Sequence, residues 1–289
     1  MQVHKPLKIR LAKDAGFCFG VRDAIQKAQE TAQEQGEVYM LGDIVHNERV
    51  VENLEKDNIR VVDSLDQVEN APVLFRAHGT TPEVWDQANQ KQLQIVDATC
   101  PLVHEIHNEI KKLEKDGRKL FIIGDHGHDE VVGIQAQVPE AIVISSVAEA
   151  QRIPRIKKGG IVSQSTQMVE NVQDIIGILA MKIFDLRFVN TVCFPTRRNQ
   201  EQIKELAPVS DLMLIVGSLT SANTNRLLEV SLGMNPKSYL VEKIEDIDLA
   251  WFEGVDSVGV SAGASSPDEL IEEVVEHLKH LHVKAHAET

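Results

Sequence analysis

The feature that most constrains the fold is a threefold internal repeat marked by the chain's three cysteines. Cys18, Cys100 and Cys193 stand in "DAGFCFGV", "VDATCPLV" and "VNTVCFPT". A polar helical pattern follows each cysteine, and an apolar stretch that ends in glycine comes after it. The glycines at positions 42, 124 and 217 each lie 24 residues after their cysteine. Equal spacing at three places indicates three copies of one structural unit.

Each repeat also contains a short apolar stretch that ends in small or polar residues: "VLFRAHGTTPE", "GIVSQSTQ" and "VGVSAGASSPDE". Pro82 after Thr81 is typical of a first helical turn, and Ser266 with Glu269 three residues later is typical of a capping box. We therefore expect helices to begin at these two places. Strands that alternate with helices predict an α/β fold with small, mainly parallel sheets.

The repeat predicts three α/β units related by pseudo-threefold symmetry, at residues 15–98, 99–191 and 192–289. A strand in residues 1–14 is expected to join the third unit. Because ligands bind beyond the carboxyl ends of parallel strands, the strand-end motifs should face one common centre. The tail "HVKAHAET" is predicted to be disordered.

Charge and hydropathy exclude several classes of protein. The formal net charge of −14 at pH 7 argues against a nucleic-acid partner, which would need a clustered basic face. No apolar run approaches the roughly 20 residues that a membrane helix needs, and the N-terminal stretch lacks the apolar region of a signal peptide. Three cysteines without a CxxC pair are expected to be reduced thiols of a cytoplasmic protein.

Three thiolates around one axis favour a shared metal centre over three separate buried side chains. They could hold zinc, with a water or a histidine as the fourth ligand. They could equally hold a 4Fe–4S cluster in which one iron keeps an open position. The number of ligands alone does not decide between the two.

Polar residues at the predicted strand ends form a candidate anion site. Protonatable histidines, hydroxyls and an amide suit a diphosphate, and these residues are His46, His78, His128, Ser221, Asn223 and Ser265. Histidines on helical or tail stretches are expected to be solvated, and these are His104, His107, His277, His280, His282 and His286.

Glu130, two residues after His128, is a candidate proton donor if burial or a nearby anion keeps its carboxyl protonated. The alternative is a solvated carboxylate at the start of a helix, and the sequence pattern alone favours that alternative.

Taken together, these motifs resemble the 4-hydroxy-3-methylbut-2-enyl diphosphate reductase family, the IspH/LytB family. The resemblance is carried by "GFCFGV", "VHN", "AHG", "DATCPLV", "GHDEV", "NTVC", "SANTNRL" and "AGASSPD". These motifs occur in order from about residue 10 to about residue 280, so the resemblance covers nearly the whole chain.

The resemblance implies a trefoil of three α/β domains around one 4Fe–4S cluster, held by Cys18, Cys100 and Cys193 with one iron left open. It implies that the substrate's diphosphate is bound by His46, His78, His128, Ser221, Asn223 and Ser265. Glu130 would deliver protons, helped by the hydroxyls of Ser165 and Thr166. Two electrons and two protons would remove the substrate's hydroxyl and leave isopentenyl and dimethylallyl diphosphates. The electrons would come from an external flavodoxin or ferredoxin.

Four positions depart from the family's usual pattern. Asp129 stands where proline is usual and adds a charge beside the proton donor, which could make it a partial substitute donor. Ser165 replaces a threonine but keeps the hydroxyl, Ala222 replaces a serine, and Asn199 stands where arginine is usual.

Two rival functions remain open at this stage. One is a non-enzymatic iron–sulfur sensor on the same fold, which would have no need of a proton donor at Glu130. The other is a zinc hydrolase that uses the same three thiolates.

Overall fold

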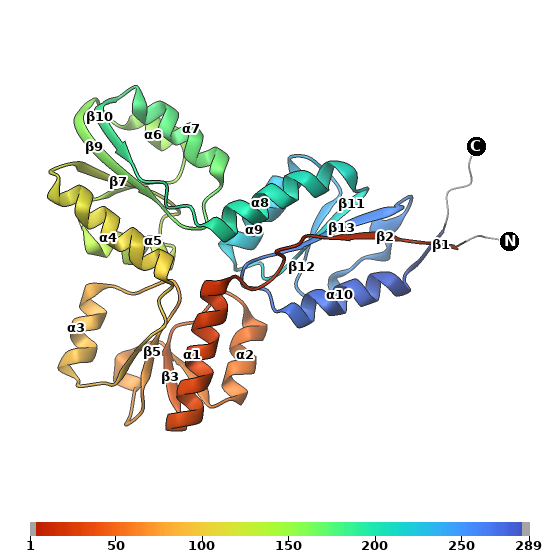
Figure 1. The fold of residues 1–289 in the computed structure, drawn as a ribbon, viewed down its shortest axis with the longest axis horizontal. Helices are drawn as coiled ribbons and strands as arrows, with labels where there is room; N and C mark the ends of the chain where they lie inside the picture. Colours follow the sequence, from red (N-terminus) through yellow and green to blue (C-terminus); the bar gives the residue numbers. More distant parts are fainter. Residues whose placement is uncertain (1–3, 285–289) are drawn as a thin grey trace. The chain divides into compact units, whose positions relative to one another are not determined.

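The structure, a computed structural model, describes residues 4–284. Within this range the strands form three four-stranded parallel sheets and one two-stranded antiparallel sheet (Figure 1). The predicted α/β class with small, parallel sheets is therefore confirmed.

The three large sheets have the same internal order. The first runs β4 (Ile59–Val62), β3 (Val38–Leu41), β5 (Val73–Phe75) and β6 (Ile95–Asp97). The second runs β8 (Ile142–Ile144), β7 (Lys119–Ile123), β9 (Ile156–Ser163) and β10 (Ile183–Phe188). The third runs β12 (Ser238–Val241), β11 (Leu212–Val216), β13 (Ser257–Ala262) and β2 (Lys8–Leu11).

Helices connect these parallel strands. Those around the first sheet are α1 (Phe19–Gln35), α2 (Glu48–Lys56) and α3 (Pro82–Gln90). Those around the second are α4 (Pro101–Lys115), α5 (Asp129–Gln137), α6 (Val147–Arg152) and α7 (Val169–Ala180). Those around the third are α8 (Phe194–Leu206), α9 (Ala222–Leu232) and α10 (Asp268–His280).

The glycine of each repeat ends the same strand of its sheet. Strands β3, β7 and β11 lie inside their sheets and are each followed directly by the glycine that the spacing singles out. Its N–H donates to the last residue of the neighbouring strand, in the pairs Gly42–Val62, Gly124–Ile144 and Gly217–Val241. The predicted strand ends are thus correct, and the repeat is structural.

Strand β7 illustrates why the core forms on both faces of the second sheet. Successive side chains of a strand point to opposite faces. Leu120 and Ile122 pack with α4 and α5, whereas Phe121 and Ile123 pack with α6 and α7. Figure 1 shows these two pairs of helices on opposite faces of β7 and β9. A continuous apolar run suits such a doubly covered strand.

Spatial contacts between residues group the chain into two compact units. The third sheet belongs to the unit of residues 1–18, 46–48 and 194–289. The first and second sheets belong to the unit of residues 19–45 and 49–193. The boundaries 15–98, 99–191 and 192–289 and the trefoil arrangement stay predictions.

The two predicted helix starts have different outcomes. Helix α3 begins at Pro82 as predicted, although the Thr81 side chain makes no capping bond. The capping box at Ser266 is wrong, because α10 begins at Asp268 with Pro267 as its N-cap. The Ser266 hydroxyl is fully buried and instead donates to the Val216 carbonyl at 2.8 Å.

The predicted disorder of the tail is wrong for its first residues. Strand β14 (His282–Lys284) pairs antiparallel with β1 (His4–Pro6). The rest of the tail, residues 285–289, lies outside the described residues. Of the helices in residues 4–284, none is both long enough and apolar enough to cross a membrane.

Candidate active site

All three cysteines are fixed by one repeated backbone hydrogen bond. The N–H of Cys100 donates to the Ala77 carbonyl at 3.0 Å, that of Cys193 to Ser165 at 2.9 Å, and that of Cys18 to Ala264 at 3.1 Å. Each acceptor lies two residues beyond the end of β5, β9 or β13. Each cysteine in turn follows β6, β10 or β2, the strand beside the acceptor's strand. The parallel ladder therefore presents each thiol in the same way, just past the carboxyl ends of its own sheet.

Each thiol also stands at the start of a helix. Cys100 is the N-cap of α4, and Cys18 and Cys193 directly precede α1 and α8. The partial positive charge of a helix N-terminus stabilises a thiolate there. Within residues 4–284 there is no disulfide, and all three cysteines are partly exposed. The chemistry of this donor set fits an iron–sulfur cluster or zinc. Among the described residues, no three His, Cys, Asp or Glu side chains gather closely enough to hold a metal ion.

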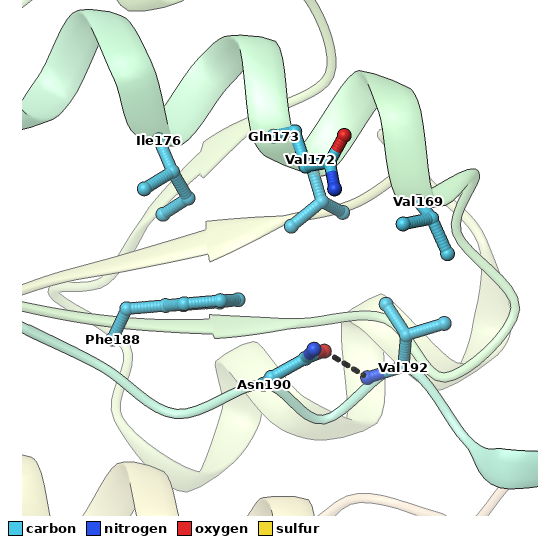
Figure 2. A pocket seen from close by; sticks show the side chains of 7 residues that line it. All are labelled: Val169, Val172, Gln173, Ile176, Phe188, Asn190 and Val192. Carbon is cyan, nitrogen blue, oxygen red and sulfur yellow. Dashed lines mark hydrogen bonds between the residues drawn. The ribbon is translucent and has the colours of Figure 1, made fainter. Parts of the chain in front are cut away.

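The turn before Cys193 is held by the core of the second sheet. Val192 is 3% exposed and packs in the cluster that contains Val172 of α7. Figure 2 shows both residues around a cavity of about 110 Å³, with the Asn190 side chain accepting a hydrogen bond from the Val192 N–H at 3.3 Å. Buried packing on one side and a closed turn on the other fix the backbone that carries Cys193.

His78 and His128 meet in the unit that contains the first two sheets. Their ring centroids lie 5.8 Å apart, with the ring planes at 80°. His128 is the N-cap of α5, and its Nδ1 accepts the Glu130 N–H at 3.1 Å. A ring nitrogen that accepts a bond carries no proton, so a neutral His128 carries its proton on Nε2. That N–H is the group it can offer to an anion.

Glu130 is buried and paired with Ser165. The glutamate is 1% exposed and the serine 7%. The Ser165 N–H donates to one carboxylate oxygen at 2.6 Å, and the Ser165 hydroxyl is hydrogen-bonded to the other at 2.7 Å. The alternative of a solvated carboxylate at a helix start is therefore wrong. Since the carbonyl of Ser165 accepts the N–H of Cys193, one serine links the acid to a cysteine.

Gln164 is a site residue that the sequence analysis missed. Its side-chain N–H donates to the Thr166 hydroxyl at 3.0 Å, and its side-chain carbonyl accepts the Asp125 N–H at 2.9 Å. It is fully buried and therefore orients Thr166 beside Ser165. The signal for it was present in the sequence, because two glutamines flank the hydroxyls in "QSTQ".

The unit that contains the third sheet brings Ser221 and Ser265 together and places Asn223 in the first turn of α9. Ser221 is the N-cap of α9, where its hydroxyl accepts the Thr224 N–H at 3.3 Å, and the Ser265 hydroxyl lies 3.4 Å from that of Ser221. Asn223 is 5% exposed, and among the described residues neither polar atom of its side chain has a hydrogen-bond partner. Leaving a buried polar group unsatisfied costs about 1–3 kcal/mol. Such an amide fits a ligand with strong acceptors.

His46 belongs to the same unit and is partly exposed in the loop between β3 and α2. Ala222 and Asn199 lie on α9 and α8, and Asn199 is 3% exposed. Nothing in the structure explains why asparagine occupies position 199.

His107 contradicts the expectation that the helical histidines are solvated. It is 7% exposed on α4, and among the described residues its Nε2 has no hydrogen-bond partner. Burial, aided by the nearby charges of His104 and Lys111, lowers the pKa of His107 from 6.5 to about 4. It lines a cavity of about 280 Å³ together with Thr99, His104 and Lys111. His107 is therefore a neutral core residue at neutral pH.

These features define a class: an α/β protein of repeated parallel sheets whose strand ends carry three cysteines, an acid–serine pair and a set of histidine, hydroxyl and amide side chains. The LytB protein family model matches residues 9–279. The chain belongs to the LytB family.

Individual relatives agree with this assignment. The 4-hydroxy-3-methylbut-2-enyl diphosphate reductase of Geobacter sulfurreducens is 40% identical over 274 residues, which cover 94% of this chain and 97% of that protein. That of Pelobacter propionicus is 39% identical over 96% of this chain and 100% of its own length.

Two solved structures share the fold. The E-1-hydroxy-2-methyl-but-2-enyl-4-diphosphate reductase of Plasmodium falciparum has a TM-score of 0.91 at 25% identity, covering 98% of this chain and 94% of that one. An (E)-4-hydroxy-3-methyl-but-2-enyl diphosphate reductase, described as the terminal enzyme of the non-mevalonate pathway, has a TM-score of 0.69 at 35% identity. It matches over 95% of this chain and 100% of that one.

Proposed function

We propose that this chain is the reductase that converts (E)-4-hydroxy-3-methylbut-2-enyl diphosphate to isopentenyl and dimethylallyl diphosphates, the last step of the non-mevalonate pathway. The observation that carries the proposal is the chain of hydrogen bonds from Glu130 through Ser165 to the backbone of Cys193. It places a buried acid beside the turn that carries a cysteine, which suits a reaction that needs both protons and electrons.

Cys18, Cys100 and Cys193 would hold one 4Fe–4S cluster with three protein ligands. Their equivalent backbone bonds and their places at helix starts support this assignment. When bound, the cluster supplies the two electrons and an open iron for the substrate's hydroxyl.

The diphosphate would be bound by two groups of residues. His78 and His128 belong to one unit, where the Nε2–H of His128 would donate to a phosphate oxygen. His46, Ser221, Asn223 and Ser265 belong to the other. The buried and unsatisfied amide of Asn223 is the strongest support in that second group, because a phosphate oxygen would satisfy its N–H.

The reaction takes up two electrons and two protons and releases the hydroxyl as water. Glu130 would hold a proton at a carboxyl oxygen, and the Ser165 hydroxyl would pass it toward the leaving group. Thr166, oriented by Gln164, would hold the substrate's hydroxyl in line with that path. Burial of Glu130 keeps bulk water from supplying the proton at random.

The electrons would come from an external carrier of the flavodoxin or ferredoxin type. Three thiols outside any disulfide in the described residues suit a reducing cytoplasm. A cluster sensor would need no buried acid, so the Glu130–Ser165 pair favours the enzyme. No observation favours a zinc hydrolase.

The test is anaerobic reconstitution with iron and sulfide, followed by turnover of the substrate with a reduced viologen dye. We expect about four irons per chain, as the family's cluster type implies, and formation of both products. A protein that binds one zinc per chain and gains no visible absorbance would contradict the cofactor. A fully loaded protein without turnover would contradict the activity and favour the sensor.

A further inference from the structure

Arg76 and Asp129 form an ion pair between the two loops that carry His78 and His128. The guanidinium Nη2 lies 2.8 Å from Asp129 Oδ1, and the side chains are 24% and 31% exposed. Arg76 follows β5 of the first sheet, and Asp129 is the first residue of α5, which follows β7 of the second. The pair thus connects the strand ends of two different sheets within one unit.

The backbone on both sides of the pair is tightly constrained. Gly79 N–H donates to the Arg76 carbonyl at 3.0 Å, which closes a turn around His78, and Gly79 has a φ of 79°. A Cβ on Gly42 would lie 2.7 Å from Arg76 Nη1, so the guanidinium packs directly on the turn after β3. Arg76 therefore has little room to move away from Asp129.

Each partner lies within two residues of a histidine. His128, beside Asp129, is fixed by its own bond to the Glu130 N–H at 3.1 Å. Any shift between the Arg76 turn and the start of α5 would change the 5.8 Å separation of the two imidazoles. We propose that Arg76 and Asp129 are a positioning pair that sets the spacing of His78 and His128 for the diphosphate.

The pair also explains how the structure accommodates an aspartate at position 129, where the family usually has proline. Its negative charge is compensated by Arg76 instead of repelling an anionic ligand. The Asp129 carboxylate is therefore turned toward the Arg76 guanidinium at 2.8 Å.

This inference rests on the proposed diphosphate site. Its test distinguishes the positioning of the two histidines from the direct electrostatic effect of the Asp129 charge on the bound anion. Asp129→Asn removes a negative charge near an anion, so charge alone predicts tighter binding of inorganic diphosphate. Loss of positioning predicts weaker binding, by about threefold to tenfold. Arg76→Met should also weaken binding, whereas Arg76→Lys should restore most of it. In turnover, KM should rise more than kcat falls.

The matched control is the ion pair between Arg118 and Asp185 in the same unit, where Arg118 Nη1 lies 3.0 Å from Asp185 Oδ1. Arg118→Met should lower the melting temperature but leave diphosphate affinity unchanged. Calorimetric titration of the anaerobically reconstituted protein measures each affinity. Tighter binding by Asp129→Asn, or wild-type affinity in Arg76→Met, would overturn the positioning role. Failure of the wild-type protein to bind diphosphate would overturn the proposed site as well.

Discussion

Replacing Glu130 by glutamine is the most direct test of how protons reach the substrate. The change keeps the size of the side chain but removes its ability to release a proton. The amide oxygen can still accept the Ser165 N–H, which now lies 2.6 Å from the carboxylate. The amide NH2 can donate to the Ser165 hydroxyl, which lies 2.7 Å away and would turn to accept that bond. Both hydrogen bonds therefore survive, and only the bond to the Ser165 hydroxyl reverses its direction.

The structure predicts a small loss of stability and a large loss of rate. The amide adds hydrogens that the carboxylate does not have, and leaving one of them without a partner in this buried place would cost about 1–3 kcal/mol. A domain with the usual stability of about 5–15 kcal/mol stays folded after such a loss. A positioned general acid contributes about 10² to 10⁴-fold in rate. Because Asp129 is held by Arg76, we expect no rescue from the neighbouring carboxylate.

Glu149→Gln is the matched control. Glu149 also accepts both the N–H and the hydroxyl of a serine, Ser145, at 2.8 and 3.1 Å, but it lies outside the candidate site. Both variants should keep wild-type iron content and diphosphate affinity, and only Glu130→Gln should lose turnover with a reduced viologen. Near-normal turnover by Glu130→Gln would show that the protons arrive by another path.

Three further outcomes are expected. Cys100→Ser should lose most of its iron and visible absorbance after anaerobic reconstitution, and full iron content would contradict a shared three-thiolate site. His78→Ala should bind inorganic diphosphate about tenfold to a hundredfold more weakly, as loss of a charge-assisted hydrogen bond implies, whereas His280→Ala should bind it normally. His107, whose pKa is lowered from 6.5 to about 4, binds a proton more readily when unfolded. The contribution of the neutral His107 to the free energy of unfolding is therefore complete above pH 6.5. It falls by about 3 kcal/mol as the pH drops to 4. Urea unfolding at a series of pH values measures this effect. The free energy of unfolding should fall less steeply with decreasing pH in His107→Leu than in the wild-type protein, and an equal fall in both would refute the assignment of His107 as a buried neutral residue.

The repeat could be predicted from the sequence because local chemistry marks it. Strands that end in glycine recur at one spacing, and Gly42, Gly124 and Gly217 each end an inner strand. The unit boundaries predicted from the sequence place each cysteine at the start of the unit that follows it, whereas each cysteine N–H is bonded to the sheet whose edge strand precedes that cysteine. That fact depends on the pairing of β6, β10 and β2 with β5, β9 and β13, which is long-range in the chain for β2 and β13.

The errors at individual side chains have a shared physical cause. Ser266 has the sequence of a helix cap, but its buried hydroxyl donates to the Val216 carbonyl and the helix begins at Asp268. His107 lies on a polar helical stretch, but its position faces the Gly79 turn, where burial keeps it neutral. Tertiary contacts decide both cases, and a single sequence does not contain them.

The three repeats differ in side-chain chemistry at the residue whose carbonyl accepts the cysteine N–H. The carbonyls that accept the cysteine N–H groups belong to Ala77, Ser165 and Ala264, so only the second repeat has a hydroxyl there. That hydroxyl is the one bonded to Glu130. Ser165→Ala makes the second repeat like the other two, and the backbone bond to Cys193 should persist because it uses only main-chain atoms. We expect normal iron content with turnover slowed by about tenfold, less than for a lost general acid. Wild-type turnover by Ser165→Ala would show that its hydroxyl takes no part in proton delivery.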